Sequence, residues 1–367
     1  MYIESIELKD FRNYEDFSYG FDPGVNLIAG RNAQGKTNLI EGICLSSIGR
    51  SFRTVHDNEL IRFGAEMAQV RVKAQKKYVS TKVEIRINKS SKKQIKKDGT
   101  LIHRTSQLID NILIVVFSPD DLRIVKEEPE KRRKFIDREL AQIKPAYYQA
   151  LAGFKKALLQ RNTYLKEEIV EPSLLDLWDE QLAAYGSDLI RMRKDFVEKI
   201  NGFSGRIHSS ITAGKENLTV EYVSNIPYCE DPNDQKEVFR KELRESQEKD
   251  IRMRTTSRGP HKDDLHFFLD GINVRYYGSQ GQQRTCALSL KLAELDFIRE
   301  ETGEEAILLL DDVMSELDEE RRKYLVKTLS GTQLFITMTD VDPDILEMVG
   351  EAKVITIENG KCVNGKN

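Results

Sequence analysis

The strongest constraint on this chain is an eight-residue loop, GRNAQGKT, at residues 30–37. It matches the phosphate-binding pattern G-x-x-x-x-G-K-[ST] at every position. The apolar segment 25–29 before it predicts a strand, and the segment from about 37 to 46 after it predicts an amphipathic helix. Because the motif requires this strand–loop–helix context, the sequence predicts a P-loop that binds nucleotide phosphates.

We expect the residues of this loop to have different roles in binding the nucleotide. Its glycines let backbone N–H groups surround a phosphate, and the helix N-terminus adds positive potential. We expect Lys36 to contact the β- and γ-phosphates of ATP and to act in catalysis, and Thr37 to ligate Mg²⁺. The predicted nucleotide-binding residues of the loop are Gly30, Arg31, Asn32, Ala33, Gln34, Gly35, Lys36 and Thr37.

A second motif, ILLLDD at residues 307–312, predicts an apolar strand that ends in two carboxylates. Asp311 is placed to bind Mg²⁺ directly or through water, and Asp312 to polarise the attacking water. Lys36 and Asp311 are separated by 275 residues (311 − 36). Compact kinases and small GTPases bring these motifs together over a much shorter stretch, so this spacing points to the ABC/SMC class of ATPases.

The hydrophobic pattern divides the chain into three parts. Residues 1–117 alternate with a period of two, typical of half-buried strands, apart from the helix after the P-loop. Residues 118–251 follow helical spacing, with an interruption at 218–223 that could be a strand, and strand patterns return from 252 to 367. The predicted fold is α/β: an ABC/SMC-type P-loop ATPase head, split into 1–117 and 252–367, with an inserted helical arm or lid at 118–251.

Two local expectations can be tested directly against a structure. The segment Lys89–Gly99 is rich in lysine and predicts a charged turn between strands. The apolar run 113–117 is followed by SPDD, where Ser118 is a natural N-cap and Pro119 fits the first helical position. A buried strand is therefore expected to give way to a helix at Ser118.

Two short motifs near the acidic strand support the class assignment. GSQGQQR at residues 278–284 resembles an ABC signature loop, in which Ser279, Gly281 and Gln282 would bind the γ-phosphate held by the opposite subunit. The same residues are also consistent with a serine-capped helix after a glycine turn. SELD at 315–318 resembles the D-loop that crosses between two heads, and it also fits a helix capped by Ser315.

The net charge, the cysteines and the apolar stretches of the chain limit the kinds of partner, metal site and membrane contact that we expect. The net charge is −3, so any nucleic-acid contact must come from a local patch. The four cysteines are far apart and predict neither a zinc site nor a disulfide framework. No stretch resembles a signal peptide or reaches the roughly 18 apolar residues of a membrane span. We expect a cytoplasmic protein with no membrane partner.

Two basic stretches are candidates for DNA contact. The first is 131–134 (KRRK) on a probable helix; the second contains Lys89, Lys92, Lys93, Lys96 and Lys97. Such runs are usually solvated faces, but phosphate contacts are the functional alternative, favoured for the second stretch. Arg132 and Arg133 are adjacent and cannot share one helical face, so one could pair with a carboxylate inside the arm. His261 has no neighbouring His or Cys and is interpreted as structural.

Taken together, the motifs resemble the RecF family. They run through the chain in family order as DFRNY, GRNAQGKTNLIE, GRSFR, FSPDDL, EKRRKFID, RGPHKDDL, GSQGQQR and LLLDDVMSELD. The resemblance implies an SMC-type head without a long coiled coil that dimerises on ATP and binds duplex and gapped DNA. It also implies RecR- and RecO-type mediators, RecA loading at single-strand gaps and a part in SOS induction.

The sequence departs from ABC patterns at several places. Asp312 stands where a Glu is usual, which suggests slow hydrolysis because the shorter side chain lies further from the water. Thr337 or Thr339 stands where a His is usual. The chain also departs from RecF-like sequences, which tend to have a glycine before the proline of the arm motif, where Glu128 stands. Arg12 and Asn13, in the first strand–turn, are candidate adenine contacts.

The function that fits these features is an ATP-gated DNA clamp, with weak DNA-stimulated ATP hydrolysis as its switch. One alternative is an SMC-like structural head that organises DNA, although about 130 arm residues are too few for a long coiled coil. The other is a P-loop kinase acting on a small molecule. DNA would change the ATP turnover of a clamp, whereas a small acceptor would change that of a kinase.

Overall fold

The computed structural model describes residues 1–329 and 331–363 and divides into two compact units. The first unit combines Met1–Leu122 with the described residues from Glu294 onward, and the second is Arg123–Ala293. The chain leaves the second unit within one helix, α7 (Gln280–Thr302). No helix in the described part of the chain is long and apolar enough to cross a membrane.

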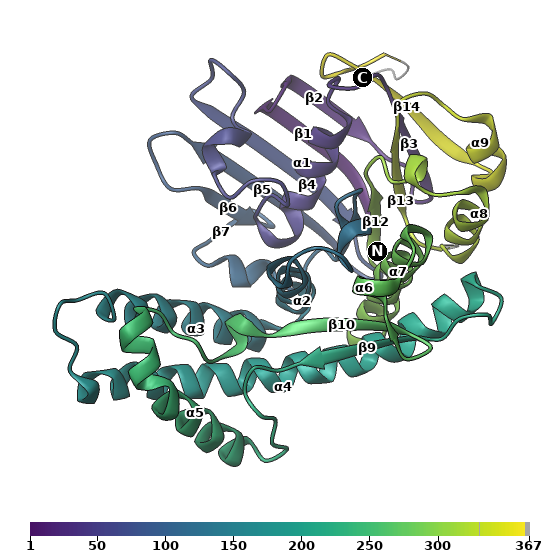
Figure 1. Cartoon of the computed structure of the whole chain (residues 1–367). Coiled ribbons are helices and arrows are strands. Elements are labelled where there is room, and N and C mark those ends of the chain that lie inside the picture. Colours follow the sequence, from purple (N-terminus) through teal and green to yellow (C-terminus); the bar gives the residue numbers. More distant parts are fainter. Residues whose placement is uncertain (330, 364–367) are drawn as a thin grey trace. The chain divides into compact units, whose positions relative to one another are not determined.

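Among its described residues, the first unit has two sheets of six strands each, and Figure 1 shows their arrangement. One is antiparallel, in the order β2-β1-β4-β5-β6-β7, with bounds Tyr14–Gly20, Tyr2–Phe11, Met67–Gln75, Ser80–Asn88, Gln94–Lys97 and Thr100–Ile102. The other has the order β15-β14-β3-β13-β12-β8, with bounds Lys361–Cys362, Ala352–Glu358, Val25–Ala29, Leu334–Met338, Ile307–Leu310 and Ile114–Phe117. Its strands are parallel except for the hairpin strand β15.

Helix α1 (Lys36–Ile48) joins these two sheets into one core. It is buried on almost every side, which explains why apolar residues surround it rather than lining one stripe. The helix approaches β1 closely at Gly42, where a Cβ would lie 2.9 Å from Leu8 Cδ2. The parallel strands β3, β12 and β13 end beside the N-terminus of α1, so the loops that follow them meet there. The shorter helices α8 (Glu319–Thr328) and α9 (Pro343–Val349) complete the unit.

The second unit is built mainly of helices. It contains α2, α3, α4, α5 and α6, with bounds Pro129–Ile143, Pro145–Tyr164, Pro172–Ile211, Pro232–Met253 and Val274–Tyr277. A three-stranded antiparallel sheet, in the order β11-β10-β9, consists of Ile272–Asn273, Asp264–Leu269 and Leu218–Val223. Figure 1 shows α3 and α4 as a long pair, with β9 lying along α4.

Several local expectations are confirmed. The strand, loop and helix around the P-loop are present, and Leu218–Val223 forms β9. The alternation in β5 buries Thr81, Val83, Ile85 and Ile87 on one face.

Three expectations are wrong. The segment Lys89–Gly99 is not all turn, because Gln94–Lys97 pairs with β5 as β6. No α-helix begins at Ser118: Ser118 N donates to Asp121 Oδ2 at 2.8 Å, only the short 3₁₀ helix Asp121–Arg123 follows, and the next α-helix begins at Pro129. Ser315 does not cap a helix, since Asp318 is the N-cap of α8 and accepts from Arg321 N at 3.0 Å.

Candidate nucleotide-binding site

The loop between β3 and α1 has a backbone that two glycines make possible. Gly30 has φ 154°, and a Cβ there would lie 2.4 Å from the carbonyl oxygen of Ile357. Gly35 has φ 120°, and a Cβ there would lie 2.8 Å from the amide of Asn13. These positive φ values and close approaches explain why the motif places glycine at its first and sixth positions.

The loop is supported from two sides of the same unit. From the β1–β2 turn, Asn13 Nδ2 donates to Gln34 O at 2.9 Å and Tyr14 Oη donates to Gly35 O at 3.0 Å. From the β14–β15 turn, Gly360 N also donates to Gln34 O, at 3.0 Å. Asn13, a candidate adenine contact, therefore has a part in holding the loop.

Lys36 lies inside the curve of this loop, with 4% of its surface exposed. Its Nζ donates to Gly30 O at 2.7 Å and to Arg31 O at 3.2 Å. The ammonium is thus held at the concave side of the loop, where phosphate oxygens would be bound by the backbone N–H groups. Arg31, Asn32 and Ala33 are exposed at the outer rim.

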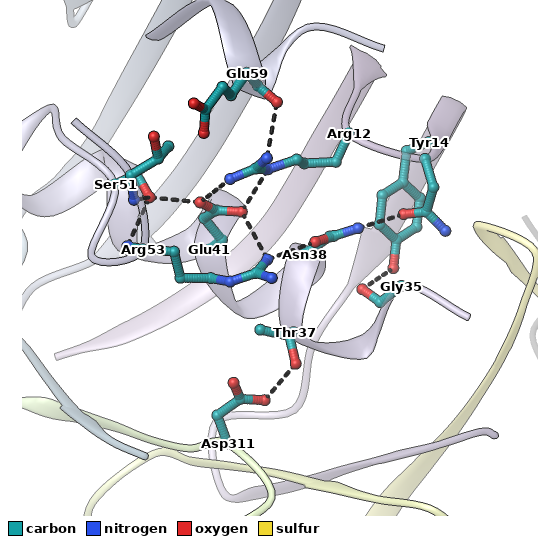
Figure 2. Close-up of polar contacts among 12 residues, drawn as sticks. Arg12, Tyr14, Gly35, Thr37, Asn38, Glu41, Ser51, Arg53, Glu59 and Asp311 are labelled. Atoms are coloured by element: carbon teal, nitrogen blue, oxygen red, sulfur yellow. Dashed lines mark hydrogen bonds and ion pairs between the residues drawn. The ribbon is translucent and has the colours of Figure 1, made fainter. Parts of the chain in front are cut away.

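The acidic pair after β12 lies next to the start of α1. Thr37 Oγ1 donates to Asp311 Oδ1 at 2.9 Å, although the two residues are 274 positions apart (Figure 2). Asp311 is 6% exposed, and burial raises the pKa of its carboxyl, against the hydrogen bonds from Thr37 and Thr337. Asp312 has φ 53°, the left-handed region, which re-aims the backbone directly after the strand.

Thr337, on the neighbouring strand β13, lies within hydrogen-bond distance of both carboxylates. Its Oγ1 lies 3.0 Å from Asp311 Oδ1 and 3.3 Å from Asp312 Oδ1, and it accepts from Asp312 N at 2.8 Å. A hydroxyl has one proton, so it can donate fully to only one carboxylate. Thr339 is exposed, and its backbone carbonyl accepts from Gly30 N at 3.2 Å.

The oxygen atoms gathered here suit a hard cation. Mg²⁺ prefers oxygen ligands and is usually held by one or two protein groups together with phosphate oxygens and waters. Thr37 Oγ1 and Asp311 Oδ1, 2.9 Å apart, provide such a pair. No cluster of three His, Cys, Asp or Glu side chains suited to a metal occurs among the described residues. A metal here would therefore depend on the phosphates of a nucleotide.

Beside this site lies a network that sequence reasoning missed (Figure 2). Glu41, fully buried on α1, pairs bidentately with Arg12, whose Nε and Nη2 each donate at 2.8 Å. Arg53 lies 3.3 Å from Glu41 and donates to Asn38 Oδ1 at 2.8 Å. Ser51 also donates to Glu41. Arg12, proposed from the sequence as an adenine contact, is thus engaged with Glu41, and only the motifs NLIE and GRSFR hinted at these partners.

The GSQGQQR segment forms the start of α7 in the second unit. Ser279 N donates to Gln282 Oε1 at 2.9 Å, and Gln282 N donates to Ser279 Oγ at 3.2 Å. This reciprocal pair is a capping box, so the serine-capped helix expected as one alternative is present. Ser279 is exposed, and Gly281 and Gln282 are half-buried on the first turn. A capped helix start and a phosphate-binding loop are compatible, because both rest on the free N–H groups of the first turn.

Two of the basic residues considered as DNA contacts, Arg132 and Lys93, form ion pairs within the chain. Arg132 is 1% exposed and donates to both carboxylate oxygens of Asp264, at 2.6 and 2.9 Å, which confirms that one of the adjacent arginines pairs within the arm. Lys93 pairs with Asp57 at 2.8 Å. His261 Nε2 lies 3.0 Å from Thr256 O, and burial lowers its pKa to about 4, in keeping with a structural part.

Comparison with known proteins identifies similar chains. The model of the RecF/RecN/SMC N terminal domain matches residues 2–362. The DNA replication and repair protein RecF of Clostridium tetani is 40% identical over 99% of this chain and 100% of its own, and that of Clostridioides difficile is 41% identical over 100% and 99%.

Solved structures agree with this similarity. The recombination mediator protein RecF-ATPrS in the RecFOR pathway superposes with a TM-score of 0.92 at 38% identity, over 98% of this chain and 97% of that one. A RecF-ATP structure of the same pathway gives a TM-score of 0.90 at 36% identity, over 99% and 97%. The Smc head domain of Pyrococcus furiosus gives 0.56 at 18% identity, over 99% and 96%, a likeness of fold.

Proposed function

This chain belongs to the RecF family and has the α/β fold of an ABC/SMC-type ATPase head with a helical arm, and on this premise we propose that it is an ATP-gated DNA clamp of recombinational repair. The observation that carries the proposal is the convergence of Lys36, Thr37, Asp311 and Thr337 within one unit. That convergence is what a nucleoside triphosphate site of this class needs. The ATP-bound relatives support the same assignment.

The residues of the site have the following proposed parts. Backbone N–H groups of residues 30–37 and the Lys36 ammonium hold the triphosphate. Thr37 and Asp311 hold Mg²⁺, which would neutralise charge between the phosphates. Asp312 orients and deprotonates the attacking water, and Thr337 fixes the position of both carboxylates. Because an aspartate is shorter than the usual glutamate, hydrolysis is slow and acts as a timer.

The exposed Ser279 loop is proposed to complete the site of a second copy. Ser279, Gly281 and Gln282 close over the γ-phosphate held by the opposite P-loop, so ATP stabilises a homodimer. ATP can shift the monomer–dimer equilibrium only by binding the closed dimer more tightly than the open state. Hydrolysis removes that difference and releases the clamp.

DNA, duplex and gapped, is the proposed cargo, and RecR- and RecO-type mediators and RecA are the proposed partners in the cytoplasm. The RecFOR pathway named for the solved relatives supports the mediators. RecA loading at gaps and a part in the SOS response are extensions of the same proposal. The two rival functions, an SMC-like organising head and a small-molecule kinase, have no comparable support.

The test is molecular mass by light scattering, with and without ATP and gapped DNA. A chain of 42.2 kDa should double in mass with ATP, and DNA should raise its ATP turnover. A chain that stays monomeric with ATP and DNA, or whose turnover responds to a small acceptor and not to DNA, would refute the clamp.

A further inference from the structure

The start of α7 is joined to the C-terminal end of α4 by a chain of polar side chains. Gln282, which shares the capping box with Ser279, donates from Nε2 to Glu216 Oε1 at 2.8 Å. The other oxygen of the same carboxylate, Oε2, lies 3.2 Å from His208 Nε2. His208 belongs to the last turns of α4, and Glu216 lies in the loop between α4 and β9.

The chain continues from His208 back to α7. His208 Nδ1 lies 3.2 Å from Ser289 Oγ, and Ser289 Oγ donates to Thr285 O at 2.8 Å, one turn nearer the helix start. His208 and Ser289 are fully buried, and Glu216 is 24% exposed. All these residues belong to the second unit.

The directions of the hydrogen bonds make this chain specific. A carboxylate only accepts, so Gln282 Nε2 is the donor to Glu216, and His208 joins the chain as a donor in the tautomer that carries a proton on Nε2. Gln282 in turn is committed at both ends of its amide: Nε2 donates to Glu216, and Oε1 accepts from Ser279 N. Its rotamer is therefore fixed by Glu216, and the backbone of Ser279 is fixed by Gln282. A carboxylate near the first turn of α7 is also favoured by the helix dipole.

We propose that Glu216 and His208 are positioning residues that link α4 of the arm to the Ser279 loop and hold this loop in the form that closes on a second copy. The inference deepens the proposed function and rests on it. Neither residue lies in the P-loop site. Their effect is to set the orientation of Gln282, and a shift of α4 would reach the loop through the same contacts. The arm thereby biases ATP-dependent dimerisation.

The test compares Glu216→Ala with Glu216→Gln and with a matched control, Glu221→Ala, an exposed carboxylate on β9. We expect Glu216→Ala to leave nucleotide affinity of the monomer within about twofold of the parent, because the P-loop lies in the other unit. We expect its dimer dissociation constant with ATP to rise about tenfold, the effect of one lost hydrogen bond to a charged group. Light scattering with ATP and calorimetry of nucleotide binding give the two values.

The conservative variant separates positioning from folding. In Glu216→Gln the amide oxygen can still accept from Gln282 Nε2, so dimerisation should return to within about threefold of the parent. Glu221→Ala should match the parent in both measurements. Equal dimerisation of Glu216→Ala and the parent, or a Glu216→Gln variant as defective as Glu216→Ala, would overturn the inference. If the parent itself failed to dimerise with ATP, the clamp proposal would fail instead.

Discussion

Two regions of the molecule differ in how fully their polar groups are buried and hydrogen-bonded within the chain: the P-loop side, around Lys36 and Asp311, and the Ser279 side, at the start of α7. Lys36 and Asp311 are 4% and 6% exposed and are held by contacts inside the first unit. Ser279 is exposed at the start of α7 in the second unit, with only its own helix turn as a cap. The polar groups of the P-loop side are thus held within their own unit, whereas the Ser279 side is an exposed helix start, which the proposed function assigns to the nucleotide of a second copy.

The largest expected effect concerns the catalytic step on the P-loop side. Asp312→Asn keeps the shape of the side chain but removes its ability to take a proton from water, so kcat should fall by about 10²–10⁴-fold. ATP should still drive dimerisation, since Lys36 and Asp311 are unchanged. Phosphate release and light scattering measure the two, with the exposed Asp16→Asn as control. Hydrolysis at the parent rate would exclude Asp312 as the base.

A somewhat smaller effect is expected on nucleotide binding. Lys36→Met removes the charge held at Gly30 O and Arg31 O, and charge-assisted contacts of this kind are worth about 1.5–3 kcal/mol. Nucleotide affinity should fall by up to about 100-fold and ATP-dependent dimerisation should be lost. Calorimetry checks the affinity, and the exposed Lys9→Met serves as control. A mutant that still doubled in mass with ATP would refute the P-loop assignment.

A third variant separates the role of Thr337, on β13, from that of Thr339, just after this strand. Thr337→Val removes the hydroxyl that accepts from Asp312 N, and a partly buried N–H left without a partner costs up to about 3 kcal/mol. We expect a lower melting temperature together with slower hydrolysis. Thr339→Val, on an exposed side chain of the same segment, is the matched control and should change the melting temperature little. The reverse order of effects would mean that Thr339, rather than Thr337, serves the acidic pair.

The P-loop and the acidic strand could be predicted because their chemistry is local. Short sequence patterns predict a glycine at positive φ, the helix that follows it and a strand that ends in carboxylates. Gly30, Thr37 and Asp311 lie at the positions that these patterns predict. The pairing of Thr37 with Asp311 follows from parallel strands ending at one edge. Which threonine would approach Asp311 could not be predicted, since it depends on the register of β13 against β12.

Other parts depend on contacts that the sequence does not mark. Glu41 lies in a helix that the sequence predicts to be amphipathic, where a glutamate would ordinarily be solvated, yet α1 is buried on almost every side and Arg12 from the β1–β2 turn pairs with the buried carboxylate. The link from Gln282 through Glu216 to His208 joins three separate segments. After Ser118 only the short 3₁₀ helix Asp121–Arg123 forms, and the sequence alone does not separate this short turn from the start of a longer helix.

The smallest effect is expected for the basic stretch near β6. Each lysine that contacts a DNA phosphate should contribute about 0.9 to the log–log salt slope of binding. Replacing Lys92, Lys96 and Lys97 with Ala should flatten the slope, whereas Lys93→Ala should change it less because Lys93 already pairs with Asp57. Binding isotherms at several salt concentrations check this, with Lys241→Ala on α5 as control. An unchanged slope in the triple variant would indicate that these lysines form a solvated face and do not contact DNA.

The central claim, that the Ser279 side serves the nucleotide of another copy, is tested most directly by Ser279→Arg. Its P-loop is intact, so calorimetry should show nucleotide affinity like that of the parent. Light scattering with ATP should show a mass near 42.2 kDa rather than twice that value, because the bulky side chain blocks closure. Loss of nucleotide affinity in the monomer would place the loop in its own subunit's pocket, and a normal ATP-dependent doubling of mass would remove it from the interface; either result would contradict the account.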